Sequence, residues 1–118
     1  MQATVLLNLE QLREVIDLMG EDDPAAFDRW IVRLESELAE FKKLLPLVRA
    51  EDGPRATSAA HSLKGTCLVM GAQALAERFA ELEACSKGGK IAEFNRLATE
   101  SRELETASLQ ALREASTQ

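Results

Sequence analysis

The chain has 118 residues, of which 46% are hydrophobic and 29% are charged, and its formal net charge at pH 7 is −6. A chain of this length supports one domain, residues 1–118, with a single modest core. The excess of acidic residues argues against binding to nucleic acid, whose phosphates are also negative. No apolar run reaches the roughly 20 residues that span a membrane, and the most frequent residues, Leu, Ala, Glu and Arg, favour helices.

The N-terminal residues 1–8 lack the basic segment and the long apolar stretch of a secretory signal peptide. The only two cysteines, Cys67 and Cys85, do not have the spacing of metal ligands. Without an export signal, we expect both to be reduced and buried in the core. The sequence therefore predicts a cytoplasmic protein with no membrane segment and no disulfide.

A short first helix is predicted over residues 8–19. Asn8 is a suitable N-cap, and Gln11 stands at the reciprocal position of a capping box. Leu7 and Leu12 have the spacing of a hydrophobic staple. We expect this helix to cap one end of the molecule.

A long second helix is predicted over residues 23–49, with Asp23 as its cap and Pro24 at its first position. Its apolar residues recur at alternating spacings of four and three, which is typical of a helix packed in an antiparallel bundle. They are Phe27, Ile31, Leu34, Leu38, Phe41, Leu45 and Val48. Pro46 predicts either a bend or an end near Leu45, because proline inside a helix removes a hydrogen bond.

Three further helices are predicted over residues 54–70, 72–87 and 90–115, separated by Gly71 and by the two glycines that follow Lys87. The last carries one inward stripe: Phe94, Leu97, Ser101, Leu104, Ser108 and Ala111. Four long amphipathic helices with short turns predict an all-α fold, an antiparallel up-down-up-down four-helix bundle with a short N-terminal capping helix. Because such a bundle closes its own core, we expect a monomer.

His61 is the only histidine in the chain. On a helix that advances roughly 100° per residue, three residues share its face, namely Lys64, Gly65 and Leu68. Thr57 precedes it on this face by one turn. The opposite face is apolar and comprises Ala56, Ala59, Ala60, Leu63, Cys67 and Met70. The imidazole is therefore predicted to project into solvent.

A lone histidine lacks the partners of a hydrolytic triad, a zinc site or a haem site, but its neutral nitrogen is a competent phosphoryl acceptor. Lys64 would offset the negative charge of a phosphoryl group. Gly65 removes bulk beside the ring, at a cost of about 1 kcal/mol for glycine in a helix. Leu68 and Thr57 offer one apolar and one polar contact to a partner. We interpret the acidic residues that follow, Glu77, Glu81 and Glu83, as a solvated face without a chemical role.

One set of residues spans the third and fourth predicted helices: Ala60-His61-Ser62-Leu63-Lys64-Gly65, Gly71-Ala72, Leu75 and Leu82-Glu83. Its residue types and spacing resemble the signature of histidine-containing phosphotransfer (HPt) domains of bacterial phosphorelays. The resemblance extends over most of the chain. It implies that His61 is phosphorylated, that Lys64 stabilises the phosphate, and that Gly65 provides clearance for a partner. Cys67 is slightly larger than the residue that the family often has there.

The resemblance further implies reversible phosphoryl transfer between His61 and an aspartate of receiver domains, those of a sensor hybrid kinase and of a response regulator. Such transfer is in line and passes through a loose transition state that needs charge neutralisation. The chain shows no Gly-rich nucleotide loop, and in the family the receiver brings the acidic pocket and Mg²⁺. We therefore expect a carrier with no cofactor of its own, rather than an enzyme with an ATP site.

Two alternatives remain open at this stage. The chain is also compatible with a helical adaptor that docks a receiver or a kinase without accepting phosphate. It is likewise compatible with the phosphorylated N-terminal module of a chemotaxis-type histidine kinase. The lack of a linker-like tail after Ala115 favours a standalone protein.

Overall fold

A computed structural model describes residues 6–117, and every regular element within this range is helical. The elements in chain order are α2 (Leu9–Gly20), α3 (Ala26–Lys42), the 3-10 helix η1 (Ala50–Asp52), α4 (Gly53–Met70), α5 (Gln73–Lys87), α6 (Ile91–Glu100) and α7 (Arg102–Ser116). The all-α class expected from the sequence is thus confirmed. None of the helices in the described range is long and apolar enough to cross a membrane.

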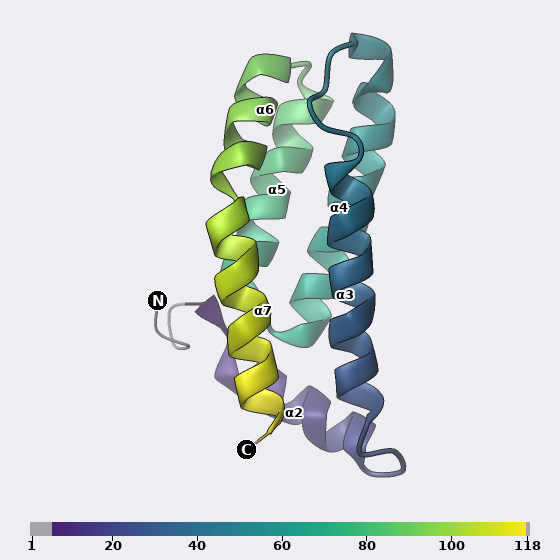
Figure 1. The fold of residues 1–118 in the computed structure, drawn as a ribbon, viewed down its shortest axis with the longest axis vertical. Coiled ribbons are helices and arrows are strands. Elements are labelled where there is room, and N and C mark those ends of the chain that lie inside the picture. The colour runs from purple at the N-terminus through teal and green to yellow at the C-terminus, as the bar shows by residue number, and fades with distance from the viewer. Residues whose placement is uncertain (1–5, 118) are drawn as a thin grey trace.

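The molecule measures 45 × 27 × 18 Å along its three principal axes. The long helices lie side by side along the longest of them. Figure 1 shows α3, α4, α5 and the α6–α7 pair in this arrangement, with α2 across one end. The most extensive packing is between α4 and α5. In addition, α3 packs against α4 and α7, and α5 packs against α6 and α7, so these helices surround a common core.

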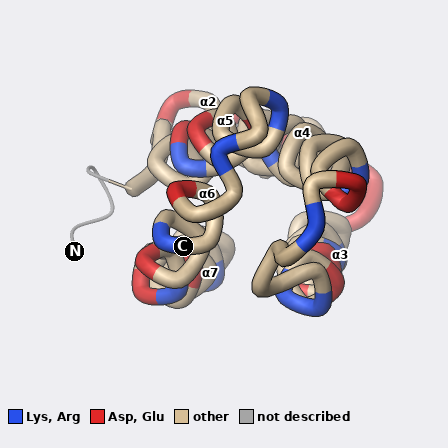
Figure 2. Tube along the Cα trace, turned by 90° about the horizontal axis from the view of Figure 1, so that it is seen from above, with Lys and Arg blue, Asp and Glu red and all other residues tan. Residues whose placement is uncertain are grey.

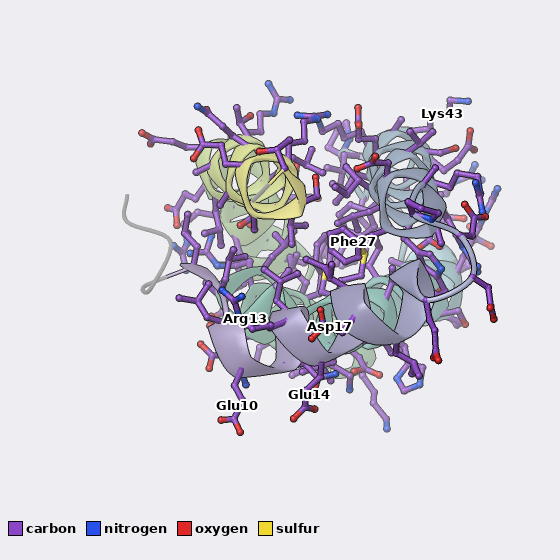
Figure 3. The ribbon with its side chains drawn as sticks, turned by 90° about the horizontal axis from the view of Figure 1, so that it is seen from below. Glu10, Arg13, Glu14, Asp17, Phe27 and Lys43 are labelled. Carbon is purple, nitrogen blue, oxygen red and sulfur yellow. The ribbon has the colours of Figure 1, made fainter. Side chains whose placement is uncertain are left out.

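Phenylalanine rings from three helices meet in this core. Phe41 of α3 lies edge-on to Phe79 of α5 with ring centroids 5.3 Å apart, and its centroid is 6.0 Å from that of Phe94 in α6. Phe27 projects from α3 among the helices, as Figure 3 shows from below. All four rings are buried, and three of them, Phe27, Phe41 and Phe94, lie in the apolar stripes predicted from the sequence. Each buried ring contributes roughly 1.5–3 kcal/mol relative to an exposed one.

Helix α2 is capped by Asn8, whose Oδ1 accepts a hydrogen bond of 3.1 Å from the Gln11 backbone N–H. The capping-box prediction is wrong for the side chain of Gln11, which donates instead to the Val69 carbonyl at 3.2 Å. The Asn8 backbone N–H donates to the Gly71 carbonyl at 2.8 Å. The Gln11 side chain and the Asn8 backbone N–H thus dock α2 on the end of α4 and on the turn that follows it. Figure 3 shows Glu10 pointing away from the other helices.

Gly71 occupies the left-handed region, with φ of +79°. A Cβ atom here would lie 3.0 Å from the Asn8 carbonyl oxygen and 3.0 Å from the Leu12 nitrogen. Both the backbone conformation and the close approach of α2 therefore require glycine.

Helix α3 is shorter at both ends than the helix predicted over residues 23–49. Asp23 does not cap it. Its Oδ1 accepts the Ala25 N–H at 3.1 Å in a turn before the helix, and its carboxylate also pairs with Arg29. The helix ends at Lys42, before the end near Leu45 that Pro46 suggested.

Residues 43–49, which we call the strap, lead from α3 towards α4. Leu47 is buried at the centre of the strap. Its N–H donates to Oδ1 of Asn95 at 2.7 Å, and its carbonyl accepts from Nδ2 of Asn95 at 2.7 Å. The side-chain amide of Asn95, in α6, thus pairs with the N–H and the carbonyl of Leu47, which a longer α3 would have paired within the helix.

The predicted helix over residues 90–115 is in fact two helices, α6 and α7, that meet at the buried Ser101. The Ser101 hydroxyl donates to the Leu97 carbonyl at 2.6 Å and accepts from Nη1 of Arg78 at 3.0 Å. The break thus lies where a buried hydroxyl is tied to Arg78 of the neighbouring helix α5.

The two cysteines do not form a disulfide. Cys67 is buried as predicted, and burial raises the pKa of its thiol to about 12. Cys85 is only half-buried. Cys67 is therefore a protonated core residue at neutral pH.

Candidate functional site

His61 lies in the middle of α4, and its side chain is 68% exposed. The apolar face of α4 turns inward, as predicted; its buried residues include Ala56, Ala60, Leu63, Cys67 and Met70. Because this face fixes the rotation of the helix, His61 is held at the surface along the side that meets α5.

A carboxylate from α5 joins the two polar residues that the sequence placed on one face of α4. His61 Nδ1 lies 2.7 Å from Glu83 Oε2, and Lys64 Nζ lies 2.7 Å from Glu83 Oε1. The side chain of Glu83 is 19% exposed. The interpretation of Glu83 as part of a solvated face was therefore wrong. The Leu82-Glu83 pair in the family-like set was the signal that pointed to it.

The hydrogen bond from Lys64 is the largest of the effects that hold the pKa of Glu83 below its ordinary value of 4.5. Burial opposes it, and the hydrogen bond from His61 adds a smaller lowering effect. Glu83 is thus ionised at neutral pH and can only accept hydrogen bonds. We accordingly assign the proton of the neutral imidazole to Nδ1. The other ring nitrogen, Nε2, then carries the free lone pair and is the nucleophilic atom.

Gly65 lies one turn from His61 on the exposed side of α4. A Cβ atom at this position would have no neighbour within 4 Å. No packing within the described residues therefore requires glycine here. Leu68, predicted as an apolar contact, is 46% exposed, and the adjacent Val69, which the sequence analysis did not single out, is 45% exposed.

Thr57 is half-buried and its hydroxyl is already engaged within the domain. Its Oγ1 lies 2.9 Å from the Gly53 carbonyl oxygen and 2.8 Å from Oγ of Ser86 in α5. The structure thus places Thr57 on the face of His61, as predicted, but does not leave its hydroxyl free for a partner.

The charges on helix α4 differ in sign from those of the whole chain. Both signs are distributed around the molecule in Figure 2, and the chain as a whole is acidic. The sequence of α4, however, contains Arg55 and Lys64 but no Asp or Glu. Within residues 6–117, no group of three or more His, Cys, Asp or Glu side chains is placed to hold a metal ion.

Fold and site together define an all-helical domain that presents one accessible imidazole nucleophile, oriented by a carboxylate from the neighbouring helix. The sequence model of the Hpt domain matches residues 8–115. The chain therefore belongs to the Hpt domain family, which confirms the resemblance seen in the sequence. No curated protein and no solved structure matches the chain.

Hpt domains take part in histidine phosphotransfer in two-component phosphorelays. They are phosphocarrier modules without an ATP site of their own, and they interact with the receiver domains of response regulators.

Proposed function

We propose that the protein accepts a phosphoryl group on Nε2 of His61 and exchanges it with an aspartate of receiver domains. The observation that carries this proposal is the 2.7 Å contact between His61 Nδ1 and Glu83 on an imidazole that is otherwise exposed. This contact leaves Nε2 basic and accessible, which in-line attack on phosphorus requires.

In the transfer, the Nε2 lone pair forms a bond to phosphorus while the bond from phosphorus to the aspartyl oxygen breaks, and the aspartate leaves as a carboxylate. The imidazole gains positive charge as the N–P bond forms. Glu83 offsets that charge because its carboxylate remains bonded to the Nδ1 proton. The reverse reaction passes through the same arrangement.

Lys64 supports the incoming phosphoryl group. Its ammonium bonds to the same carboxylate as His61 and is 28% exposed, so it lies beside the imidazole and remains accessible. A cation at this position neutralises charge on the phosphoryl oxygens. The absence of acidic residues from α4 favours the same approach of an anion.

The partners in this proposal are the receiver domains of a sensor hybrid kinase and of a response regulator, which would bring Mg²⁺. The carrier itself would need no cofactor. Gly65 leaves room for the receiver, and the exposed Leu68 supplies an apolar contact. We further propose that the helices around the core form an antiparallel four-helix bundle and that the protein acts as a monomer; the order and arrangement of the helices in Figure 1 support the bundle.

The test is transfer of label from a phosphorylated receiver domain to the wild-type protein and to variants. Wild type should become labelled through an acid-labile, base-stable bond, and His61→Gln should not. Lys64→Ala should accept label roughly ten- to hundredfold more slowly, because one charge-assisted contact contributes about 1.5–3 kcal/mol. Lys43→Ala, which removes a surface lysine paired with Glu40 in α3, is the matched control.

Labelling of His61→Gln would contradict the assignment of the acceptor. If a panel of phosphorylated receivers transfers nothing to wild type, while a receiver still binds both wild type and His61→Gln, the protein is instead a docking adaptor.

A further inference from the structure

Three polar contacts join α4 to α5 along the face of His61. They are Thr57 with Ser86, His61 with Glu83, and Lys64 with Glu83. The first lies one turn from the second on both helices, since Thr57 is four residues before His61 and Ser86 is three residues after Glu83. The contacts therefore form a ladder that crosses the interface between the two helices.

The Thr57–Ser86 contact is short, and each of its two hydroxyls also lies next to a backbone carbonyl. The two hydroxyls hold two protons, so two of these three contacts are hydrogen bonds at any one time. The two hydroxyl oxygens are 2.8 Å apart. Thr57 Oγ1 lies 2.9 Å from the Gly53 carbonyl, and Ser86 Oγ lies 3.1 Å from the Glu83 carbonyl. Because each hydroxyl oxygen is separated from its Cα by a single carbon, the Thr57–Ser86 contact exists only at one narrow separation of the helices.

The two contacts of Glu83, with His61 and with Lys64, depend on the separation between α4 and α5. Both carboxylate oxygens of Glu83 are engaged at 2.7 Å, one by His61 and one by Lys64. A free carboxylate follows a displaced donor by rotation of its side chain. A carboxylate that bridges two donors loses one bond when it follows the other.

We infer that Thr57 and Ser86 are positioning residues that hold α4 and α5 at the distance at which Glu83 fixes the His61 tautomer. This inference rests on the proposed function, because the tautomer matters through the nucleophilic Nε2. It also gives a role to Thr57 that differs from direct contact with a partner. A shallow hollow of about 460 Å³ opens beside the Thr57–Ser86 pair, with Pro54 and Lys87 in its lining. A partner that enters this hollow would contact the pair. Positioning of the helices and contact with a partner therefore need separate readouts.

The variants are Thr57→Val, which removes the hydroxyl at nearly constant volume, Ser86→Ala, and Thr57→Ser as the conservative rescue. Thr99→Val is the matched control, because Thr99 also bonds to the carbonyl four residues earlier, at 3.0 Å, but is exposed on α6. The first readout is the protonation of the two ring nitrogens of His61, measured by ¹⁵N NMR on the isolated protein at neutral pH. The second is the rate of labelling by a phosphorylated receiver.

Wild type and Thr99→Val should hold the neutral ring mainly as the Nδ1–H tautomer. Thr57→Val and Ser86→Ala should shift the ring towards the mixture of tautomers found for free imidazole and should be labelled roughly tenfold more slowly, by the loss of one hydrogen bond to a charged group. The pKa of Glu83 should move back towards 4.5 in both variants. Thr57→Ser should restore the wild-type tautomer and rate. If Thr57→Val does not fold, Ser86→Ala provides the same comparison.

An unchanged tautomer in both Thr57→Val and Ser86→Ala would overturn the inference, whatever the effect on stability. An unchanged tautomer with slower labelling of Thr57→Val would mean that Thr57 contacts the receiver directly. No labelling of wild type would remove the proposed function and this inference with it. That outcome is distinguishable, because the tautomer is measured without a partner.

Discussion

Each oxygen of the Glu83 carboxylate serves a different donor, Oε2 for His61 and Oε1 for Lys64. Lys64 can therefore turn towards a phosphoryl group on Nε2 without any change in the bond that orients the ring. The ammonium exchanges one anionic partner for another, so it does not have to be desolvated without compensation. Under the proposed function, Glu83 would hold both partners in the resting state and release Lys64 on phosphorylation.

The ionisation of Glu83 should appear in the pH dependence of stability. Its pKa in the folded protein is lowered, chiefly by Lys64, so its contacts stabilise the fold fully above 4.5 and cease to do so as the pH falls through the lowered value. Urea unfolding should find wild type more stable than Glu83→Gln at pH 7, with the difference disappearing in acid. Glu81→Gln, an exposed acid of the same helix, controls for net charge. A difference that is constant from pH 7 to pH 3 would contradict this account.

Substitution by alanine should have opposite effects on stability at Gly65 in α4 and at Gly71 in the turn that follows it. Gly65→Ala should raise the free energy of unfolding by about 0.5–1 kcal/mol, because it improves helix propensity without a clash, while it slows labelling by a receiver. Gly71→Ala should lower the free energy of unfolding by at least about 1–2 kcal/mol, because of its left-handed backbone and the closeness of Asn8. Urea unfolding and the labelling assay measure both effects. Unchanged labelling of Gly65→Ala would show that Gly65 does not provide clearance.

The residues on one helix face were predictable, and the contacts between helices were not. His61, Lys64 and Gly65 follow from spacing along a single helix, which is a local property of the sequence. The pairing of Glu83 with His61 depends on the register between α4 and α5, which periodicity does not specify. For the same reason, Thr57 was placed on the correct face while its partner Ser86 was missed.

The helix faces were likewise easier to predict than the helix ends. The apolar stripe of α3 is correct up to Phe41, but the helix ends at Lys42 because the chain then bonds to Asn95 of a distant helix. The break at Ser101 similarly lies where a buried hydroxyl bonds to Arg78 of α5. In both places a tertiary contact accompanies the helix end, and the local pattern does not contain that contact.

The strap gives a direct test of one such contact. Asn95→Ala removes both hydrogen bonds to the backbone of Leu47 and should lower the free energy of unfolding by about 1–3 kcal/mol, the range for buried polar groups left without partners. Hydrogen exchange at the Leu47 amide should accelerate. Gln110→Ala, which removes an exposed amide in α7, is the control. Equal stability of the two variants would show that the strap does not depend on Asn95.

Helix α3 packs against α7, and this contact includes a buried carboxylate. Glu105 of α7 is only 4% exposed, and the Lys42 ammonium lies 3.5 Å from its Oε2, too far for a strong hydrogen bond. Ser108, one turn further on, is buried with an unpartnered hydroxyl. Packing of α3 against α7 therefore buries the Glu105 carboxylate, and the Lys42 ammonium offsets the cost of its desolvation only in part.

Glu105→Gln should accordingly stabilise the whole domain at neutral pH. Burial raises the pKa of Glu105, so the folded state favours the protonated carboxyl, and its ionisation destabilises the fold increasingly as the pH rises above 4.5. The neutral amide avoids this effect. Thermal unfolding should show a higher midpoint for Glu105→Gln than for wild type at pH 7 and similar midpoints in acid. Glu103→Gln, which changes the same charge at an exposed position, should not show this pattern.

All residues of the site come from a single helical hairpin, α4 and α5, and this has a consequence for how the chain folds. His61 and Glu83 are 22 residues apart, whereas Leu47 and Asn95 are 48 apart. The entropy lost on closing a loop grows with its length, by about 0.6 kcal/mol for each doubling. The nucleophile can thus acquire its orienting carboxylate by a local closure as the chain leaves the ribosome, before α6 is available to anchor the strap.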